Sequence, residues 1–277
     1  FYFYAYNVSN YAKLFKYNGT TVTQISNTSP GGSDWPSSLT QLGSNLYFSS
    51  YDNGNHVYKY DGTSLTMISD PSANNVNAVT VAGSNLYYIL NTGGGNINFL
   101  YKYDGTTATL ISMPADTSAF ELMSGGSNLY AVGYNYVTGA KKVFKYDGTT
   151  LTQISDTNTS GSHNDDPWLV NYNAGLFYYT AFDGTKTNLY EYDGTTSTAL
   201  LDSQAGGPDN IGAPFTMGSK LYFRGYNGSI GGVYSYDGSS LATIYNNSAF
   251  SVNDLVATSN KVFFNVSDNS PNASPPS

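Results

Sequence analysis

The 277-residue sequence contains no cysteine, which excludes a disulfide scaffold, a thiolate metal site and a cysteine nucleophile. Basic residues are also few: Lys and Arg total 11 against 19 Asp and Glu, the net charge is −8, and Arg224 is the single arginine. Such a chain cannot form the clustered basic surface that nucleic acids or anionic membranes require, so both are excluded as partners. No apolar run approaches the roughly 18 residues needed to cross a bilayer, so membrane insertion is excluded too.

Aromatic residues are abundant instead. The chain has 27 Tyr and 14 Phe, but only two Trp and two Glu, Glu121 and Glu191. Aromatic and Thr-rich composition with few helix-forming residues is typical of pleated sheets. The composition therefore predicts an all-β protein.

An internal repeat predicts the architecture. One 12-residue unit occurs six times, its glycines are 43 to 46 residues apart, and a second element such as GSNLYF (43–48) precedes most copies. A period near 44 with two hairpins in each period is typical of a four-stranded β-propeller blade. The six copies are FKYNGTTVTQIS (15–26), YKYDGTSLTMIS (58–69), YKYDGTTATLIS (101–112), FKYDGTTLTQIS (144–155), YEYDGTTSTALL (190–201) and YSYDGSSLATIY (234–245).

The second repeat illustrates the expected blade. Its strands are predicted at residues 39–42, 46–51, 57–60 and 64–68. The Asp-Gly pair between the last two strands predicts a type I′ turn, in which both residues have positive φ. Adjacent aromatic residues within the strands predict that both faces of each sheet are covered by neighbouring blades.

The strand count favours six blades. The sequence predicts 25 strands, whereas six closed blades need 24 and seven need 28. We expect residues 255–258 to join the N-terminal strands and close a ring, which removes the exposed sheet edges. Seven blades, or a fragment of a larger ring, are the alternatives. Residues 1–267 are predicted to form one domain, and the Pro/Ser-rich residues 268–277 a tail or linker.

The stretch LYFSSYDNGNHVYKYDGTSLTMIS (46–69) resembles the ELWxxDGT type of β-propeller repeat, with His56-Val57-Tyr58 where that pattern has Glu and Trp. Comparable stretches cover nearly all of the chain. Proteins with such repeats are mostly extracellular and surface-associated, so the resemblance implies a location outside the cell. It implies no reaction.

Variable loops at one end of the blades are the candidate ligand-binding face, because loops carry specificity on a rigid scaffold. These loops hold both Trp and most acidic residues outside the repeat turns. Carboxylates and amides hydrogen-bond sugar hydroxyls, and an indole stacks on a sugar ring; the same Asx residues also begin turns and satisfy local backbone amides. The candidates are Asp34, Trp35, Asn74, Asp116, Asp165, Asp166, Trp168, Asp209, Asn210 and Asp254.

Metal binding and catalysis have little support in the sequence. Residues 52–55, Asp-Asn-Gly-Asn, offer oxygen ligands for Ca²⁺ but lack a terminal bidentate acid, so we expect no cofactor, with Ca²⁺ as the alternative. His56 and His163 lie in different repeats and form no zinc pair. Glu191 occupies a position that holds Lys in four other repeats, which indicates a surface residue. We expect no catalytic residue, with a hydrolase or lyase as the alternative.

Two further features concern modification and assembly. Seven N-x-S/T sequons in turns, loops or the tail are glycosylation candidates, and an eighth, at Asn265, lies in the last predicted strand. Because the sequence has one strand more than six blades need, we expect residues 1–7 and 261–267 to compete for the same position in the ring. The strand left out could pair with a second copy of the chain. The candidate residues for this pairing are Phe1, Phe3, Val262, Phe263 and Phe264. The sequon candidates are Asn7, Asn18, Asn27, Asn158, Asn227, Asn246 and Asn272.

Together these features predict a non-catalytic, glycosylated propeller at the cell surface or in an extracellular matrix. Its predicted role is structural assembly or adhesion, including filament formation by self-association. The alternatives are a carbohydrate-binding lectin that uses one rim, and a glycoside-active enzyme.

Overall fold

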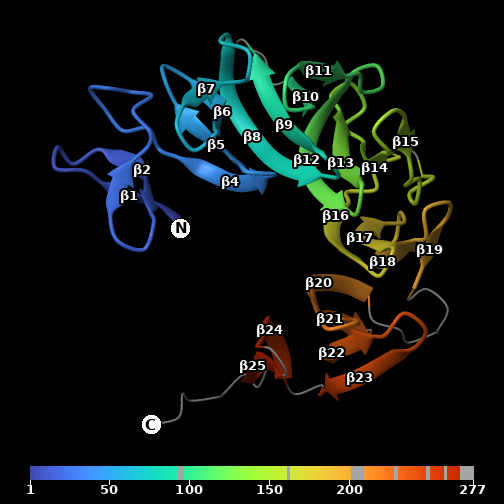
Figure 1. Ribbon diagram of the computed structural model, residues 1–277. Helices are drawn as coiled ribbons and strands as arrows, with labels where there is room; N and C mark the ends of the chain where they lie inside the picture. Colours follow the sequence, from blue (N-terminus) through green and yellow to red (C-terminus); the bar gives the residue numbers. More distant parts are fainter. Residues whose placement is uncertain are drawn as a thin grey trace. The chain divides into compact units, whose positions relative to one another are not determined.

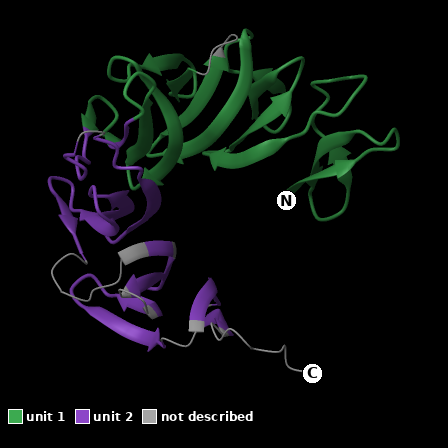
Figure 2. Cartoon of the chain, turned by 180° about the vertical axis from the view of Figure 1, so that it is seen from behind, with its two compact units in different colours: residues 1–139, 144–152 green, residues 140–143, 153–277 purple. Residues whose placement is uncertain are grey.

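The computed structural model describes residues 1–92, 97–160, 163–200, 209–227, 230–247, 250–258 and 261–268. These residues form 25 β-strands and contain no helix, which confirms the all-β class (Figure 1). The chain divides into two compact units, which Figure 2 colours separately: residues 1–139 with 144–152, and residues 140–143 with 153–277.

Every sheet is antiparallel and is built from strands that follow one another along the chain. The first sheet has three strands, five sheets have four, and the last has two. The three-stranded sheet contains β1 (Tyr2–Tyr6), β2 (Ala12–Tyr17) and β3 (Val22–Gln24). The next two contain β4 (Ser37–Leu42), β5 (Asn45–Tyr51), β6 (Asn55–Tyr60) and β7 (Leu65–Met67), then β8 (Ala73–Ala82), β9 (Asn85–Thr92), β10 (Asn98–Tyr103) and β11 (Ala108–Ile111).

The remaining sheets repeat this order. The fourth contains β12 (Thr117–Gly125), β13 (Asn128–Asn135), β14 (Lys141–Tyr146) and β15 (Leu151–Gln153). The fifth and sixth contain β16 (Trp168–Asn173), β17 (Leu176–Phe182), β18 (Thr187–Tyr192) and β19 (Ser197–Ala199), then β20 (Asp209–Met217), β21 (Lys220–Asn227), β22 (Ile230–Tyr236) and β23 (Leu241–Asn246). The two-stranded sheet contains β24 (Phe250–Ala257) and β25 (Val262–Asp268).

The repeat units therefore fold into the expected four-stranded sheets. In the second repeat, β4 to β7 reproduce the predicted order, and each strand begins and ends within two residues of its prediction. The number of blades and the closure of a ring stay predictions at this stage. So does the single domain of residues 1–267, and the tail from residue 269 lies outside the described part of the chain.

The Asp-Gly turns differ from the prediction. Gly62 has a φ of +103°, but Asp61 does not have a positive φ, so this connection is not a type I′ turn. It is a four-residue loop in which Asp61 Oδ1 accepts hydrogen bonds from the backbone N–H of Thr63 (2.9 Å) and Ser64 (2.7 Å). The Tyr60 hydroxyl donates to the Gly62 carbonyl at 2.7 Å and holds the turn from the strand side.

The backbone donors around this turn stabilise the ionised carboxylate. Because Ser64 and Thr63 donate to Asp61, the pKa of its carboxyl falls to about 2. Three later turns show the same shift to about 2 from the same backbone donors, and together we call these four residues the turn aspartates: Asp61, Asp104, Asp147 and Asp193.

The core confirms that both faces of an inner sheet are covered. Tyr87 and Tyr88 are consecutive residues of β9, and both are at most 1 % exposed. Tyr87 packs in a cluster with Leu129 of β13, whereas Tyr88 packs in a second cluster with Tyr47 of β5. Adjacent aromatic residues thus serve two interfaces, one on each side of their sheet.

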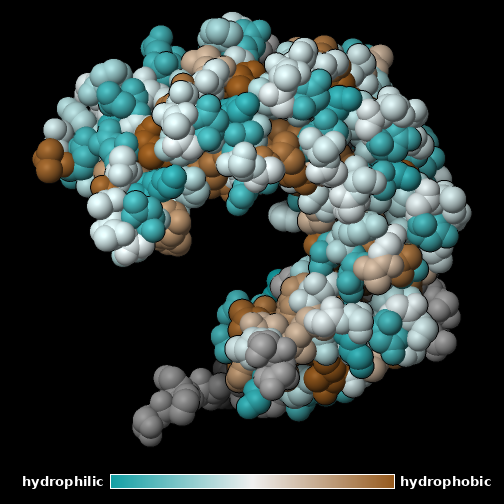
Figure 3. Space-filling view, viewed as in Figure 1, coloured by the Kyte–Doolittle hydropathy of each residue, from teal (hydrophilic) through white to brown (hydrophobic). Residues whose placement is uncertain are grey.

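Some aromatic residues remain exposed near the chain ends. Phe1 is 81 % exposed and stacks on Phe3, and Phe263 of β25 is 50 % exposed. Phe264 instead contacts the ring of Tyr245 at 5.1 Å. Both predicted assembly strands already have one partner within the chain, since β1 pairs with β2 and β25, which begins at Val262, pairs with β24. Figure 3 shows apolar residues scattered among polar ones on the visible face.

Candidate functional site

A buried ion pair anchors the loop that precedes β4. Lys13 is 1 % exposed and Asp34 is 0 % exposed, and Lys13 Nζ lies 2.8 Å from Asp34 Oδ1. The Ser26 hydroxyl donates to Asp34 Oδ2 at 2.6 Å, and the Ser29 backbone N–H donates to Oδ1 at 2.9 Å. Both charged groups are thus paired and hydrogen-bonded, which is the condition for burying them.

The loop before β16 contains a similar ion pair, although Asp165 Oδ2 has no hydrogen-bond partner among the described residues. Lys142 Nζ lies 2.8 Å from Asp165 Oδ1, and Asp165 is 0 % exposed. The backbone N–H groups of Thr157 and Asn158 donate to the same oxygen at 3.1 and 2.9 Å. Lys142 also contacts Asp156 at 2.7 Å, and this hydrogen bond lowers the pKa of the Asp156 carboxyl.

These contacts correct the predicted roles of Asp34 and Asp165. Neither carboxylate is available to a ligand on the rim, because each is fully buried and bound to a lysine. The residue that follows each carboxylate lies in the left-handed region: Trp35 has a φ of 45° and Asp166 a φ of 40°. Non-glycine residues adopt such angles where the surrounding structure imposes them, often beside functional sites.

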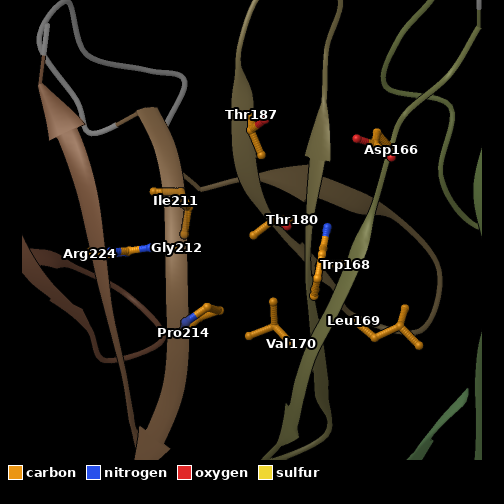
Figure 4. Close-up of a pocket in the computed structure, with 10 residues that line it drawn as sticks. All are labelled: Asp166, Trp168, Leu169, Val170, Thr180, Thr187, Ile211, Gly212, Pro214 and Arg224. Atoms are coloured by element: carbon orange, nitrogen blue, oxygen red, sulfur yellow. The ribbon is translucent and has the colours of Figure 1, made fainter. Parts of the chain in front are cut away.

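The second of these loops borders a pocket of about 600 Å³. One wall comes from Asp166 and from Trp168, Leu169 and Val170 of β16. The facing wall comes from β20 and β21, whose side chains Figure 4 shows opposite Trp168 and Val170. The whole pocket belongs to the second compact unit. Its ten lining residues are Asp166, Trp168, Leu169, Val170, Thr180, Thr187, Ile211, Gly212, Pro214 and Arg224.

The pocket combines an apolar surface with charged groups at its edges. Trp168 presents its indole with 69 % of the residue exposed. Asp166 Oδ1 lies 2.5 Å from Lys141 Nζ, so this carboxylate is already paired. Arg224 lies beside Gly212 on the facing wall (Figure 4). Such a site suits a ligand with apolar groups and at least one charge.

Four further predicted site residues, whose side chains the structure describes, do not line this pocket. Trp35 is 56 % exposed and lies edge-on to Tyr6 in the first unit. Asn74 is exposed on β8, and Asp116 accepts a hydrogen bond from the Tyr136 hydroxyl at 3.2 Å. Asp254 of β24 accepts one from Asn265. Asp209 and Asn210 begin β20, but their side chains lie outside the described part of the structure.

Asp166 and Trp168 could be predicted from the sequence, but the residues of the facing wall could not. No sequence pattern marks Ile211, Gly212 and Pro214, because they lie in an irregular strand whose register with β21 shifts twice. Thr180 and Thr187 are ordinary strand residues in the sequence. Arg224 carried one signal that could have found it: it is the only arginine of an acidic chain.

The candidate Ca²⁺ loop forms a hairpin connection between β5 and β6. The Asp52 N–H donates to the Gly54 carbonyl at 2.7 Å, and Asn53 adopts a φ of 55°. Asp52 Oδ2 accepts a long hydrogen bond of 3.3 Å from the Tyr58 hydroxyl. Within the described ranges, no three His, Cys, Asp or Glu side chains gather as a metal-binding group. The residues from 1 to 268 that the structure describes also include no helix that could cross a membrane.

The sequons differ in accessibility. Asn158 is only 1 % exposed, and its amide donates to the Asn164 carbonyl at 2.9 Å, so this candidate is corrected: a glycan there would have to break the loop. Asn7 is half-buried and Asn18, Asn27 and Asn246 are exposed. The Asn227 side chain and all of Asn272 lie outside the described part.

Comparisons with known proteins support the fold. No protein-family model matches the sequence, and no curated protein matches it. Solved structures do match. The β-propeller domain of the Trilobed protease from Pyrococcus furiosus has a TM-score of 0.53 and 12 % identity, over 97 % of this chain and 88 % of that one. That domain is described as having an open velcro topology.

Two larger peptidases also match. The Pyrococcus horikoshii acylaminoacyl peptidase has a TM-score of 0.50 and 10 % identity, over 94 % of this chain and 46 % of that one. A prolyl endopeptidase has a TM-score of 0.58 and 9 % identity, over 95 % of this chain and 47 % of that one. This chain therefore spans about half the length of each of these two peptidases. At such low identity the likeness shows a β-propeller fold and no more.

The predicted function was wrong on this evidence. The sequence predicted an extracellular surface or matrix propeller for assembly or adhesion, whereas the similar structures are the β-propeller domain of a protease and two peptidases. The error has a physical cause: Tyr-rich strands and tight turns specify how blades pack, and they carry no information about what the rim binds. An extracellular location, self-association and the ELWxxDGT resemblance stay predictions.

Proposed function

We propose that this chain is a peptidase-type propeller domain that binds peptides in the pocket between the β16–β19 and β20–β23 sheets and does not itself cleave them. The pocket carries this proposal. Its volume of about 600 Å³ lies within the usual range for small-ligand sites, which is roughly 300 to 1,000 Å³. The likeness to peptidase propellers supports a peptide as the ligand.

The lining fits a peptide chemically. Trp168, Val170 and Ile211 offer apolar surface to side chains. The hydroxyls of Thr180 and Thr187 can donate to or accept from a peptide backbone. An exposed indole in a concave site is a common anchor in protein recognition, because it buries a large area with few rotatable bonds.

Fluorescence titration of the full chain with short peptides tests the proposal. Trp168 should change its emission as a peptide such as Ala-Ala-Ala-Phe binds, and Trp168→Ala should lower affinity at least about tenfold, the effect of losing a buried aromatic anchor. Trp35→Ala is the matched control, because Trp35 is a similarly exposed indole outside the pocket. Equal affinity for Trp168→Ala and the parent chain, measured by calorimetry, would refute the proposed site.

We also propose that the domain is a closed ring of six blades. The N-terminal sheet has three strands and the C-terminal sheet begins with one that could complete it, so residues 255–258 would add the missing strand to β1, β2 and β3. Deleting residues 250–277 should then destabilise the first unit. Trp35 reports the unfolding of that unit when Trp168 is replaced by Phe, so the urea midpoint measured by Trp35 fluorescence should fall. An unchanged midpoint would contradict closure and favour an open arrangement.

A further inference from the structure

The pocket contains the only arginine of a chain that carries a net charge of −8. We infer that Arg224 binds the C-terminal carboxylate of a peptide whose last residue has an apolar or aromatic side chain. This inference rests on the proposed function and names the ligand class for the same pocket.

Gly212 makes room for the guanidinium. In the ladder between β20 and β21, Gly212 lies directly opposite Arg224. A Cβ atom added to Gly212 would lie 2.7 Å from Arg224 Nε and 3.3 Å from Nη2, closer than nonbonded atoms pack. A glycine at this position therefore gives the guanidinium room to lie against β20 at the pocket.

The hydrogen bonds that Arg224 forms with described residues use Nη1 and leave Nε and Nη2 available. Nη1 donates to the Asn253 carbonyl at 2.5 Å and lies 3.5 Å from the Val252 carbonyl. These contacts come from β24 and hold the far side of the guanidinium. Among the residues that the structure describes, no carboxylate forms an ion pair with Arg224. The Nε and Nη2 donors form a planar fork that matches the two oxygens of a carboxylate.

The local charge selects an anion. Among the described residues that line the pocket, Asp166 is the one that is acidic, and Lys141 pairs with it at 2.5 Å. The charge of Arg224 is thus uncompensated within the pocket, which favours a negative group and disfavours a peptide amine near it.

The apolar wall indicates which carboxylate of a peptide binds Arg224: the C-terminal one, and not an Asp or Glu side chain. Ile211, Pro214 and Val170 line the pocket near Gly212 and Arg224 (Figure 4). An α-carboxylate at Arg224 would direct the side chain of the same terminal residue toward this surface. An Asp or Glu side chain within a peptide would instead place polar backbone groups there, which costs free energy unless each is hydrogen-bonded.

Three peptides test the inference on the full chain: Ala-Ala-Ala-Phe with a free carboxylate, the same peptide as its C-terminal amide, and an acetylated, amidated peptide with an internal Asp. Calorimetry should show the free acid binding at least about tenfold tighter than the other two, since hydrogen bonds between charged groups are the strong ones. Equal affinity of acid and amide would overturn the inference while leaving the proposed function in place. Equal affinity of the internal Asp peptide would overturn the α-carboxylate as the source. Failure of all three peptides to bind would overturn the proposed function itself.

Substitutions provide the second arm. Arg224→Gln should reduce the affinity for the free acid to that for the amide and leave the amide unchanged, and Gly212→Ala should act in the same direction by displacing the guanidinium. Lys220→Gln is the matched control, because it removes one positive charge from the same strand at an exposed position outside the pocket. A preference for the free acid that survives Arg224→Gln would refute the role of Arg224. The Arg224→Lys variant, which keeps the charge but not the fork, should bind the free acid with intermediate affinity if Arg224→Gln disturbs folding.

Discussion

Replacing Lys13 by Met should destabilise the first unit by about 3–5 kcal/mol, the usual effect of breaking a buried ion pair from one side. Lys13 Nζ donates to Asp34 Oδ1 and the Ser29 carbonyl, both at 2.8 Å, and to Asn27 Oδ1 at 3.1 Å. Met fills a similar volume but offers no donor, so three acceptors each lose the hydrogen bond from Lys13. Asp34, at 0 % exposure, would then be buried without a counter-ion.

Lys142→Met is the matched comparison. Asp165 is as buried as Asp34, but the Lys142 side chain is 12 % exposed against 1 % for Lys13, so water can reach Asp165 once the lysine is removed. The second partner of Lys142, Asp156, is 66 % exposed and can return to water. We therefore expect a smaller loss of about 1–3 kcal/mol, the range for leaving a polar group partly unsatisfied. The difference between the two variants measures how much burial contributes beyond the contact itself.

Each unit contains one tryptophan next to its ion pair, which gives a local assay. Urea unfolding of Lys13→Met is followed through Trp35 in a Trp168→Phe background, and that of Lys142→Met through Trp168 in a Trp35→Phe background. The double variant Lys13→Met/Asp34→Leu should recover part of the loss, because it removes both charges. A loss below about 1 kcal/mol for Lys13→Met, or equal losses at the two sites, would refute the reasoning from burial.

Three further outcomes follow from the packing and the turns. Gly133→Ala should lower the free energy of unfolding by about 1–3 kcal/mol, because its Cβ would lie 2.5 Å from the Phe144 ring, whereas Gly31→Ala, with no neighbour within 4 Å, should leave the urea midpoint unchanged. Ile89→Ala should cost about 2–5 kcal/mol in the same assay, because Ile89 is fully buried, and a loss below 1 kcal/mol would contradict the packing. The turn aspartates have pKa values lowered to about 2 in the folded chain, against about 3.8 when unfolded. Their contribution to the stability of the fold is therefore complete above pH 3.8 and is lost as the pH falls toward 2. Urea midpoints that stay constant from pH 5 to pH 2.5 would contradict this expectation.

Much of the fold could be predicted because its determinants are local and repeated. The glycine at each turn and the apolar pair in each LY-type strand recur at a fixed period, so the order of 25 strands follows from the sequence. The turn type could not be predicted from Asp-Gly alone. There the Asp61 carboxylate accepts from Thr63 and Ser64, and these bonds favour a longer loop over the two-residue hairpin.

The site was harder to predict because its residues do not share a repeat position. Asp165 and Asp166 are consecutive acids in the sequence, yet one is buried on Lys142 and the other borders the pocket. Their difference depends on which carboxylate meets the backbone donors of Thr157 and Asn158. Arg224 comes from the following repeat, and only the packing of two sheets brings it to the same pocket as Trp168.

The ion pairs Lys13–Asp34 and Lys142–Asp165 also suggest how the repeats were duplicated. Lys13 and Lys142 are 129 positions apart and Asp34 and Asp165 are 131 apart, close to three periods of the repeat. The segments FKYNGTTVTQIS (15–26) and FKYDGTTLTQIS (144–155), which follow the two lysines, are identical at ten of 12 positions. An ancestor with three repeats that was copied as a block would place the same anchor in the first and fourth repeats, and the Arg224 pocket would then be a later specialisation of the second copy.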